Sequence, residues 1–423
     1  MKVTALMNDF KSGLNDSVLL DFYVDKSLVE PQKKRYIALL KEYLGKFGDE
    51  DVIILSVPGR SEITGNHTDH QHGCVLACSI NLDIICVAAK ADKTEIYSNG
   101  QLIAGVSAED TSFDPSQKHT SAALCRGVMN RLEVNGFKIG NFHAVMRSNV
   151  RVGSGLSSSA AFEVMIGTIM SYLYNEGKVD KVEIAKYSQY AENQYFGKPC
   201  GLMDQCACAL GGVAYIDFED PSNPIIDQIG FKLNDYGYSL CIVNTGGSHS
   251  KLTGEYSAIT EEMGQIAAFF NEKVLRNVSE RQILNNLKLL RDNYGDRAVM
   301  RSLHMIRENE RVMRQRDNLK EGNIEGFIKT IKESGNSSFK YLQNVYTNID
   351  VAYQPLSLAL MISEGFLGED EACRVHGGGF AGTIQAFVKN ENVSEYKKLM
   401  DKVFGKDACI VLQVNNHGSD RVL

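Results

Sequence analysis

Apolar positions along the chain follow two periods, one near 2 residues and one near 3.6. Apolar runs rich in Val, Ile, Tyr and Phe predict strands at 51–57, 74–89, 93–98, 142–148, 211–218 and 238–245. Helical periodicity predicts helices near 15–24, 30–47, 156–175, 181–196, 256–272, 279–292, 296–317, 322–341 and 351–364. Two late strands, at 383–389 and 409–415, flank a helix near 393–404. The pattern predicts an α+β protein with mixed sheets and helices, whose second half is the more helical.

The length of 423 residues exceeds what one hydrophobic core usually serves, so two domains are expected. The stretch "EDPSNPIIDQ" (219–228) is rich in Pro and Asp and resembles a loop. We therefore expect an N-terminal domain over 1–225 and a C-terminal domain over 226–423.

Charge and composition narrow the possible partners. The chain has 45 Lys and Arg against 52 Asp and Glu, a formal charge of −7, which gives no electrostatic reason to expect nucleic acid or an anionic membrane. No apolar run approaches the ~20 residues that a membrane-spanning helix needs, and the first residues lack a signal-peptide pattern. Ten cysteines lie scattered, several in apolar runs, as is typical of reduced thiols. A cytoplasmic protein with a small-molecule ligand is expected.

The segment "GNHTDHQHG" (65–73) holds three histidines and an aspartate. His67, His70 and His72 with Asp69 offer nitrogen and oxygen ligands for zinc. Ligands so close together rarely surround a metal tetrahedrally unless a distant residue completes the site. We therefore expect no transition metal here.

A second segment, "VGSGLSSSAAFEVMIG" (152–167), runs from small residues directly into an amphipathic helix. Such a loop lets backbone N–H groups approach an anion, and the helix N-terminus adds unpaired donors and partial positive charge. A phosphate site is one interpretation. A serine of 157–159 acting as helix N-cap is the other. The segment is neither a Walker A motif nor a dinucleotide fingerprint.

A third segment, "AENQYFGKPCGLMDQCACALGG" (191–212), carries Glu192 and places Asp204 among apolar neighbours. A buried carboxylate is costly unless it is paired, so Asp204 is either a helix N-cap or an acid held ionised by a cation. Arg60, which leaves a strand end, is the candidate cation. A glycine-rich stretch, "RVHGGGFAGTIQAFV" (374–388), is equally consistent with a tight turn and with close backbone approach to a ligand.

In this order the segments resemble the galactokinases of the GHMP kinase superfamily. The signature G-R-V-N-L-I-G-E-H-T-D-Y-N-G-G is matched at Gly59, Arg60, Gly65, His67, Thr68, Asp69 and Gly73. The superfamily loop G-x-G-L-S-S-S-A is matched by 153–160. C-G-I-M-D-Q appears at 200–205 with Leu202 for Ile, and R-M-x-G-G-G-F-G-G at 374–382 with Ala381 for one glycine. The segment 244–256 is similar to N-S-x-x-x-H-S-x-x-x-x-E-Y. The resemblance spans most of the chain and implies a two-domain GHMP kinase fold with the active site in the cleft between the domains.

The resemblance also implies roles. Asp204 falls on the catalytic base that accepts the proton of a sugar C1 hydroxyl, and Arg60 on the cation that keeps this carboxylate ionised. ATP and Mg²⁺ are the implied cofactors, with Ser159 and Glu192 as oxygen ligands of the metal. Nucleotide-binding positions are Ser98, Gly153, Ser154, Gly155, Leu156, Ser157, Ser158 and Ser159. Sugar-binding positions are Asn66, His67, Thr68, Asp69, Asp204 and Tyr256, with His67 either contacting the sugar or bracing the loop.

Several positions depart from the family pattern. Asn66 replaces the glutamate of G-E-H-T-D, His70 replaces the following tyrosine, and Ser61, Glu62 and Thr64 depart from V-N-L-I. These changes leave the sugar open. The expected reaction is ATP-dependent phosphorylation of D-galactose to α-D-galactose 1-phosphate. The alternatives are a kinase for N-acetylgalactosamine or L-arabinose, and a non-catalytic sensor that binds galactose and ATP. The intact serine loop, Glu192 and Asp204 favour an active enzyme.

Overall fold

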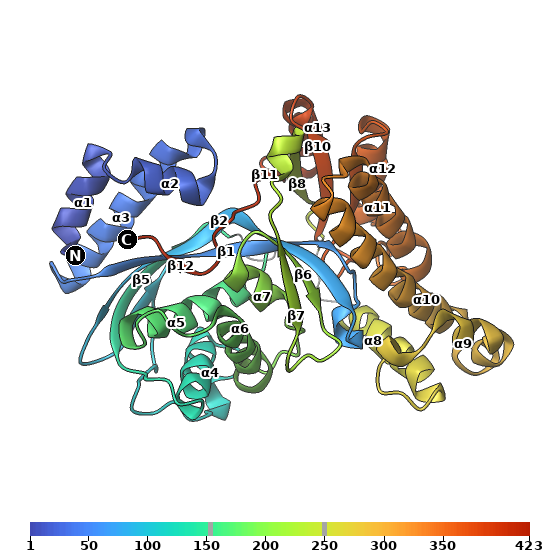
Figure 1. The fold of residues 1–423 in the computed structure, drawn as a ribbon, viewed down its shortest axis with the longest axis horizontal. Coiled ribbons are helices and arrows are strands. Elements are labelled where there is room, and N and C mark those ends of the chain that lie inside the picture. Colours follow the sequence, from blue (N-terminus) through green and yellow to red (C-terminus); the bar gives the residue numbers. More distant parts are fainter. Residues whose placement is uncertain (151–154, 248–251) are drawn as a thin grey trace.

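The larger of two β-sheets runs through the N-terminal half of the molecule (Figure 1). The structure is a computed structural model that describes residues 1–150, 155–247 and 252–423. Strand order is β12-β1-β2-β5-β3-β4, and β6 and β7 continue from the first part of the long strand β2. The strands are β1 (Ile53–Thr64), β2 (Cys74–Lys90), β3 (Glu95–Ser98), β4 (Gln101–Ile103), β5 (Phe142–Ser148), β6 (Val213–Asp217), β7 (Ile225–Ile229) and β12 (Asp420–Arg421).

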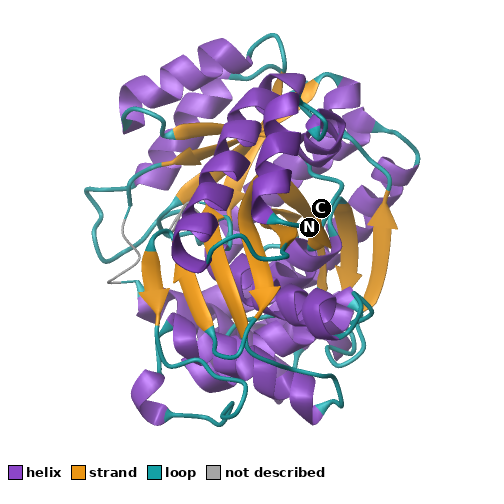
Figure 2. Cartoon of the chain, turned by 90° about the vertical axis from the view of Figure 1, so that its left-hand side faces the viewer, coloured by secondary structure: helices purple, strands orange, loops and turns teal. Residues whose placement is uncertain are grey.

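Successive side chains of a strand point to opposite sides, so the apolar strands of this sheet expose two apolar faces. Helices cover both faces. Ile54, Val87 and Val145 pack on one face against α1 (Val3–Ser12), α2 (Asp16–Tyr23) and α3 (Val29–Phe47). Their neighbours Leu55 and Cys86 pack on the other face. That face is covered by α4 (Ser121–Val134), α5 (Ser158–Tyr174), α6 (Lys181–Tyr190) and α7 (Met203–Leu210). Figure 2 shows the strands side by side, with the two chain ends close together.

The second sheet is antiparallel, in the order β11-β8-β10-β9. It contains β8 (Tyr238–Asn244), β9 (Ala372–His376), β10 (Thr383–Lys389) and β11 (Cys409–Leu412). One face packs on α12 (Pro355–Phe366) and α13 (Val393–Phe404). On the other face Leu240 and Phe387 share a core with α10 (Leu287–Lys320), α11 (Ile324–Ser337) and with Cys78 and Tyr215 of the large sheet. This common core fixes the two sheets relative to each other. Figure 1 shows α8 (Thr253–Phe269) and α9 (Glu280–Asn285) beyond it.

Most predicted elements are confirmed, with shifted ends. The strands predicted at 74–89, 142–148, 238–245 and 383–389 match β2, β5, β8 and β10. The gap between the helices predicted at 279–292 and 296–317 coincides with a sharp bend of α10 at Gly295, where φ is +82°. Elements that escaped prediction are α1, α4, α7, β4, β7, β9 and β12. They are short or mix small and polar residues, so neither period stands out.

The stretch 219–228 was predicted as a loop, and that prediction is wrong in part. Ile225–Ile229 form β7, which pairs with β6 of the large sheet. Pairing with a buried neighbour overrides the loop-like local composition. An N-terminal domain ending at residue 225 stays a prediction, and a border there would divide β7 between the two domains.

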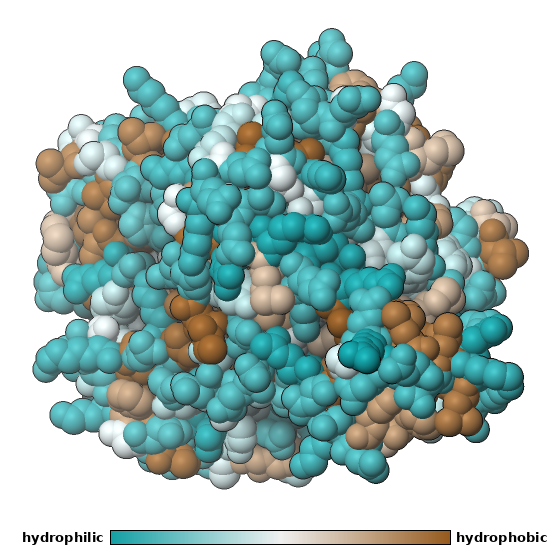
Figure 3. All heavy atoms as spheres, turned by 45° about the vertical axis from the view of Figure 1, so that its right-hand side comes forward, coloured by the Kyte–Doolittle hydropathy of each residue, from teal (hydrophilic) through white to brown (hydrophobic). Residues whose placement is uncertain are grey.

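The surface carries its apolar residues in separate groups among hydrophilic ones on the face that Figure 3 brings forward. Among the described residues, no helix combines the length and apolar character that crossing a membrane requires.

Candidate functional site

An ion pair joins Arg60 to Asp204 at the start of α7; Arg60 lies within β1, which continues to Thr64, and not beyond a strand end as predicted. Arg60 is buried, and its Nε lies 2.7 Å from Oδ1 of Asp204, while Nη1 donates a hydrogen bond to the carbonyl of Gly155. Ser157 donates to the other oxygen of Asp204. Burial raises the pKa of Asp204, but the charge and hydrogen bond of Arg60 and the hydroxyl of Ser157 outweigh it, so the pKa lies below its usual value. The Asp204 side chain remains 33% exposed. The predicted pairing with a cation is thus present, whereas the N-cap of α7 is Leu202.

The loop that joins β1 to β2, residues 65–73, is fixed from behind by α10. Glu308 accepts from the backbone N–H of Gly65 at 3.2 Å, and the Nε2–H of His304 donates to the carbonyl of Asn66 at 3.1 Å. Gln315 bonds the hydroxyl of Thr64. His304, Glu308 and Gln315 are fully buried. No motif pointed to this helix, but its polar residues at helical spacing were the available signal.

Within the loop, the predicted sugar-binding residues separate into two kinds. Asn66 and Thr68 are fully buried, and their side chains bond protein groups. His67 and Asp69 are partly exposed. His67 shares hydrogen bonds with Gly378 O at 3.0 Å and with His70 at 3.3 Å, so its ring braces the loop against the glycine-rich turn. The described residues include no group of three His, Cys, Asp or Glu side chains placed to hold a metal.

Asp69 faces Gly201 and Asp204. Burial and the negative charge of Asp204 raise the pKa of Asp69 to about 6. A Cβ added at Gly201 would lie 1.9 Å from Oδ2 of Asp69, so only glycine lets the two segments approach this closely. Tyr256 contacts the glycine-rich turn. Its hydroxyl donates to Gly379 O at 2.6 Å, and its ring packs edge-on against Phe380.

The predicted nucleotide segment is described from Gly155 onward; Gly153 and Ser154 lie outside the described residues. Helix α5 begins at Ser158, and no side chain of the described residues caps it. Ser157 occupies the N-cap position but with φ +58°, and its hydroxyl serves Asp204 instead. The N-cap interpretation of these serines therefore does not hold for Ser157, and the first N–H groups of α5 keep their anion-binding potential. Leu156 is buried beneath them.

Ser98 ends β3 at the level of Met146 in β5, the strand that leads toward this segment. Its place near a nucleotide stays a prediction.

Glu192 lies on a π-helical turn, η4 (Ala191–Phe196), that continues α6. Its carboxylate is 3.5 Å from the hydroxyl of Ser159 and 3.0 Å from Nζ of Lys198, and it accepts from Gln205 at 2.9 Å. Beside it, Oε1 of Glu163 is buried without a hydrogen-bond partner, and burial and Glu192 raise the pKa of Glu163. Two carboxylates and a hydroxyl form a hard-oxygen donor set that fits Mg²⁺.

A cavity of about 190 Å³ opens between β1, the loop 65–73, the start of α7 and the glycine-rich turn. Its walls include Arg60, Glu62, Asn66, His67, Asp69 and Asp204. A larger cavity of about 580 Å³ lies between α11, α12 and β9, but none of the predicted site residues lines it. We assign the chemistry to the smaller cavity, because Arg60, Asp69 and Asp204 line it and none of them lines the larger one.

The chain is similar to known proteins in sequence and in fold. The family model "GHMP kinases N terminal domain" matches residues 122–212, and "Galactokinase galactose-binding signature" matches 41–90. Galactokinase from Clostridium tetani is 30% identical over 87% of this chain and 92% of its own, and that from Glaesserella parasuis is 30% identical over 86% and 92%. The crystal structure of Lactococcus lactis galactokinase complexed with galactose superposes with a TM-score of 0.76 at 21% identity, covering 91% of this chain and 99% of its own. The expected GHMP kinase fold is confirmed.

Proposed function

Because the chain belongs to the galactokinase family, we propose that it phosphorylates D-galactose at the C1 hydroxyl with ATP, giving α-D-galactose 1-phosphate and ADP. The observation that carries the proposal is the Arg60–Asp204 pair, which holds an ionised carboxylate on the wall of a small polar cavity. The uncapped N-terminus of α5 begins directly beside it, through the Ser157 contact.

Asp204 is the proposed general base. Its carboxylate accepts the proton of the C1 hydroxyl as that oxygen attacks the γ-phosphorus, and the bond from phosphorus to the β,γ-bridging oxygen breaks to release ADP. Arg60 keeps Asp204 ionised and adds positive charge where negative charge develops on the transferred group. Catalysis of this kind depends mainly on positioning and electrostatics, and both residues are fixed by further contacts.

The nucleotide is proposed to bind at the start of α5, with Ser98 and residues 153–159 as contacts. Backbone N–H groups at a helix N-terminus suit the phosphate oxygens. Ser159 and Glu192 are the proposed ligands of Mg²⁺, which when bound neutralises phosphate charge. Lys198 pairs with Glu192 at 3.0 Å and is 60% exposed, so its side chain is free to move aside.

Asp69, together with Asp204, is proposed to contact the sugar in the cavity, and His67, whose two ring nitrogens have protein partners, is proposed to brace the loop. A carboxylate distinguishes epimers, because the wrong epimer leaves a buried polar group unpaired at a cost of ~1–3 kcal/mol. Thr68 and Tyr256 support this group, through the loop and through the glycine-rich turn respectively.

The test is a panel of free sugars, including D-galactose, N-acetylgalactosamine and L-arabinose, with ATP, Mg²⁺ and detection of ADP. D-galactose should give the highest kcat/KM, and Asp204→Asn should abolish turnover while galactose binding persists. A higher kcat/KM for another sugar would replace galactose as the substrate. Galactose binding without turnover of any sugar would identify a sensor instead.

A further inference from the structure

The cavity wall contains a third carboxylate besides those of Asp69 and Asp204. Glu62, on β1, lines the cavity together with Asp69 and Asp204, although it is only 4% exposed. Burial raises the pKa of Glu62, whereas the charges of Arg374 and Arg60 oppose this. A carboxylate in such a place needs hydrogen-bond donors for both of its oxygens.

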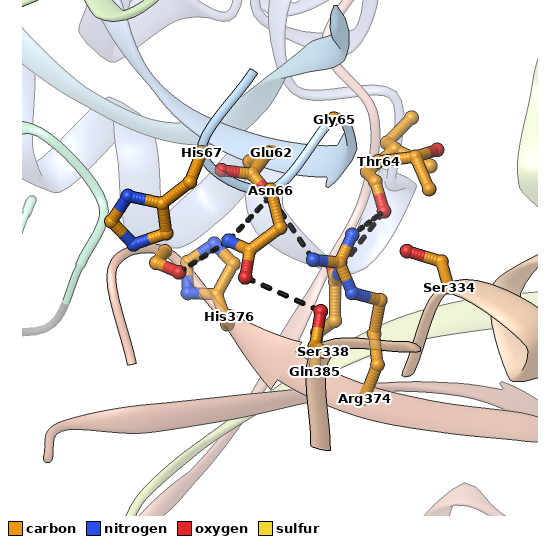
Figure 4. A network of polar contacts seen from close by, with 12 residues as sticks. Glu62, Thr64, Gly65, Asn66, His67, Ser334, Ser338, Arg374, His376 and Gln385 are labelled. Carbon is orange, nitrogen blue, oxygen red and sulfur yellow. Dashed lines mark hydrogen bonds and ion pairs between the residues drawn. The ribbon is translucent and has the colours of Figure 1, made fainter. Parts of the chain in front are cut away.

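Its neighbour Asn66 has no hydrogen-bonding capacity left. The amide N–H₂ donates to Oε1 of Glu62 at 3.2 Å and to the carbonyl of Gly377 at 2.7 Å. The amide oxygen accepts from Nδ2 of Asn344 at 2.7 Å and from the hydroxyl of Ser338 at 3.3 Å. Both donors and both acceptor sites of the amide are therefore used within the protein, as Figure 4 shows for Ser338. A ligand could bond Asn66 only by displacing one of these partners.

Glu62 is satisfied on one side only. Its Oε1 accepts from Asn66 and from Nη2 of Arg374, which lies 3.1 Å away (Figure 4). Its Oε2 accepts no hydrogen bond from any described residue. This oxygen is not fully buried, so a ligand can reach it. Arg374 is fully buried and also donates to Ile63 O at 2.7 Å, so it fixes the orientation of the carboxylate. One oxygen of Glu62 is thus held ready for a donor in the cavity.

Compared with the family signature, Glu62 and Asn66 have exchanged residue types. In G-R-V-N-L-I-G-E-H-T-D, asparagine stands at the position of Glu62 and glutamate at that of Asn66. The two residues touch each other here, so the pair still contributes one carboxylate and one amide to the same place, with the two groups exchanged.

We propose that Glu62, rather than Asn66, accepts a hydrogen bond from a sugar hydroxyl in this protein. The inference rests on the proposed function, since the hydroxyl belongs to the sugar that occupies the cavity beside Asp204. Asn66 then acts as a positioning residue, which orients Glu62 from one side while Arg374 orients it from the other. Glu62 and Asp69 together then determine which sugar the cavity binds.

The experiment compares the protein with Glu62→Gln on galactose and on its 2-, 3-, 4- and 6-deoxy analogues, by kcat/KM and by calorimetric binding without ATP. On galactose, Glu62→Gln should lose about 10- to 100-fold in both. For the one analogue that lacks the hydroxyl bound by Glu62, the loss should disappear. Glu262→Gln is the matched control, because Glu262 also pairs with a buried arginine, Arg301, but lies outside the cavity. It should leave all five sugars unchanged.

An equal loss across all five sugars, or no loss, would overturn the proposal and leave Glu62 as a structural partner of Arg374. If Glu62→Gln folds poorly, Glu62→Asp is used instead, because it keeps the charge beside Arg374 and withdraws the carboxylate by one methylene. The analogue that lacks the hydroxyl bound by Glu62 must then show no loss of kcat/KM or of binding. Failure of the proposed function has a different signature. The unaltered protein would then show no galactose turnover, and the binding series would still test Glu62; absence of galactose binding as well would remove both proposals.

Discussion

The guanidinium of Arg60 lies 2.7 Å from the carboxylate of Asp204 and is anchored on its other side by the carbonyl of Gly155. The two residues are 144 positions apart in the chain. The contact joins β1, the start of α7 and the segment before α5, which are the three parts that the proposed phosphoryl transfer has to align.

Removing the charge of Arg60 should change how activity depends on pH. Only the hydroxyl of Ser157 and the charge of Lys198 then oppose the effect of burial, so the pKa of Asp204 rises and more of the base is protonated at a given pH. Arg60→Met should lower kcat about 100-fold at pH 7.5 and move the acidic limb of the kcat profile up by about one pH unit or more. The control Arg60→Lys keeps a positive charge and should shift the limb less. An unchanged acidic limb in Arg60→Met would refute the role of Arg60.

Asp69 should oppose folding at neutral pH. Its pKa is raised to about 6 in the folded protein, so the folded state binds the proton more tightly than the unfolded chain does, and the ionised form destabilises the protein above that pH. Asp69→Asn should therefore raise the free energy of unfolding by about 1–2 kcal/mol at pH 7.5 and leave it unchanged near pH 4. Urea unfolding at both values measures this.

The same substitution should raise the KM for galactose more than tenfold at pH 7.5, because the carboxylate is lost from the cavity. In the unaltered protein, KM should rise as the pH falls below about 6. Asp292→Asn, an exposed control on α10, should change neither quantity. A KM that does not vary between pH 5 and 7.5 would contradict the assignment of Asp69.

A methyl group at Gly201 should disturb Asp69 without unfolding the protein. The added Cβ would lie 1.9 Å from Oδ2 of Asp69, so this side chain must move. Gly201→Ala should raise the KM for galactose about tenfold or more, with a small change in kcat and in Tm. Gly45→Ala is the control, since nothing lies within 4 Å of the added Cβ on α3. Unchanged sugar kinetics in Gly201→Ala would show that Asp69 does not need its present position.

Glu308 should stabilise the folded protein and hold the loop 65–73 in place. It bonds Gly65 N–H, Ser334 and Arg311, and although burial raises the pKa of Glu308, the charges of Arg311, His304 and Arg374 lower it to about 2. Since the folded pKa lies below the unfolded one, this stabilisation is present at neutral pH and is lost as the pH falls toward 2.

Glu308→Gln should cost about 2–4 kcal/mol of the free energy of unfolding at pH 7, because it leaves Arg311 without its charged partner. Denaturant titration measures the loss. Glu310→Gln, two positions along the same helix and exposed, should change the value by no more than ~0.5 kcal/mol. Equal effects of the two substitutions would argue against a supporting role for Glu308.

Several features of this protein follow from its sequence alone. The apolar periods locate β2, β5, β8, β10 and most long helices, because a buried face imposes its own repeat on the residues that form it. Asp204 stands out in its motif because an acid among apolar residues needs a partner, and Arg60 is the candidate cation. The role of Glu192 is implied only by the resemblance to galactokinases.

Only the tertiary structure decided what those groups contact. The sequence does not show that the hydroxyl of Ser157 donates to Asp204 instead of capping α5, or that α10 fixes the loop 65–73. It also does not show that the amide of Asn66 has all its hydrogen-bond partners within the protein while Glu62 lines the cavity. Each of these relationships joins residues dozens to hundreds of positions apart. Local propensity carries no information about such contacts, since packing of the two sheets brings the partners together and competition among nearby donors and acceptors settles which hydrogen bonds form.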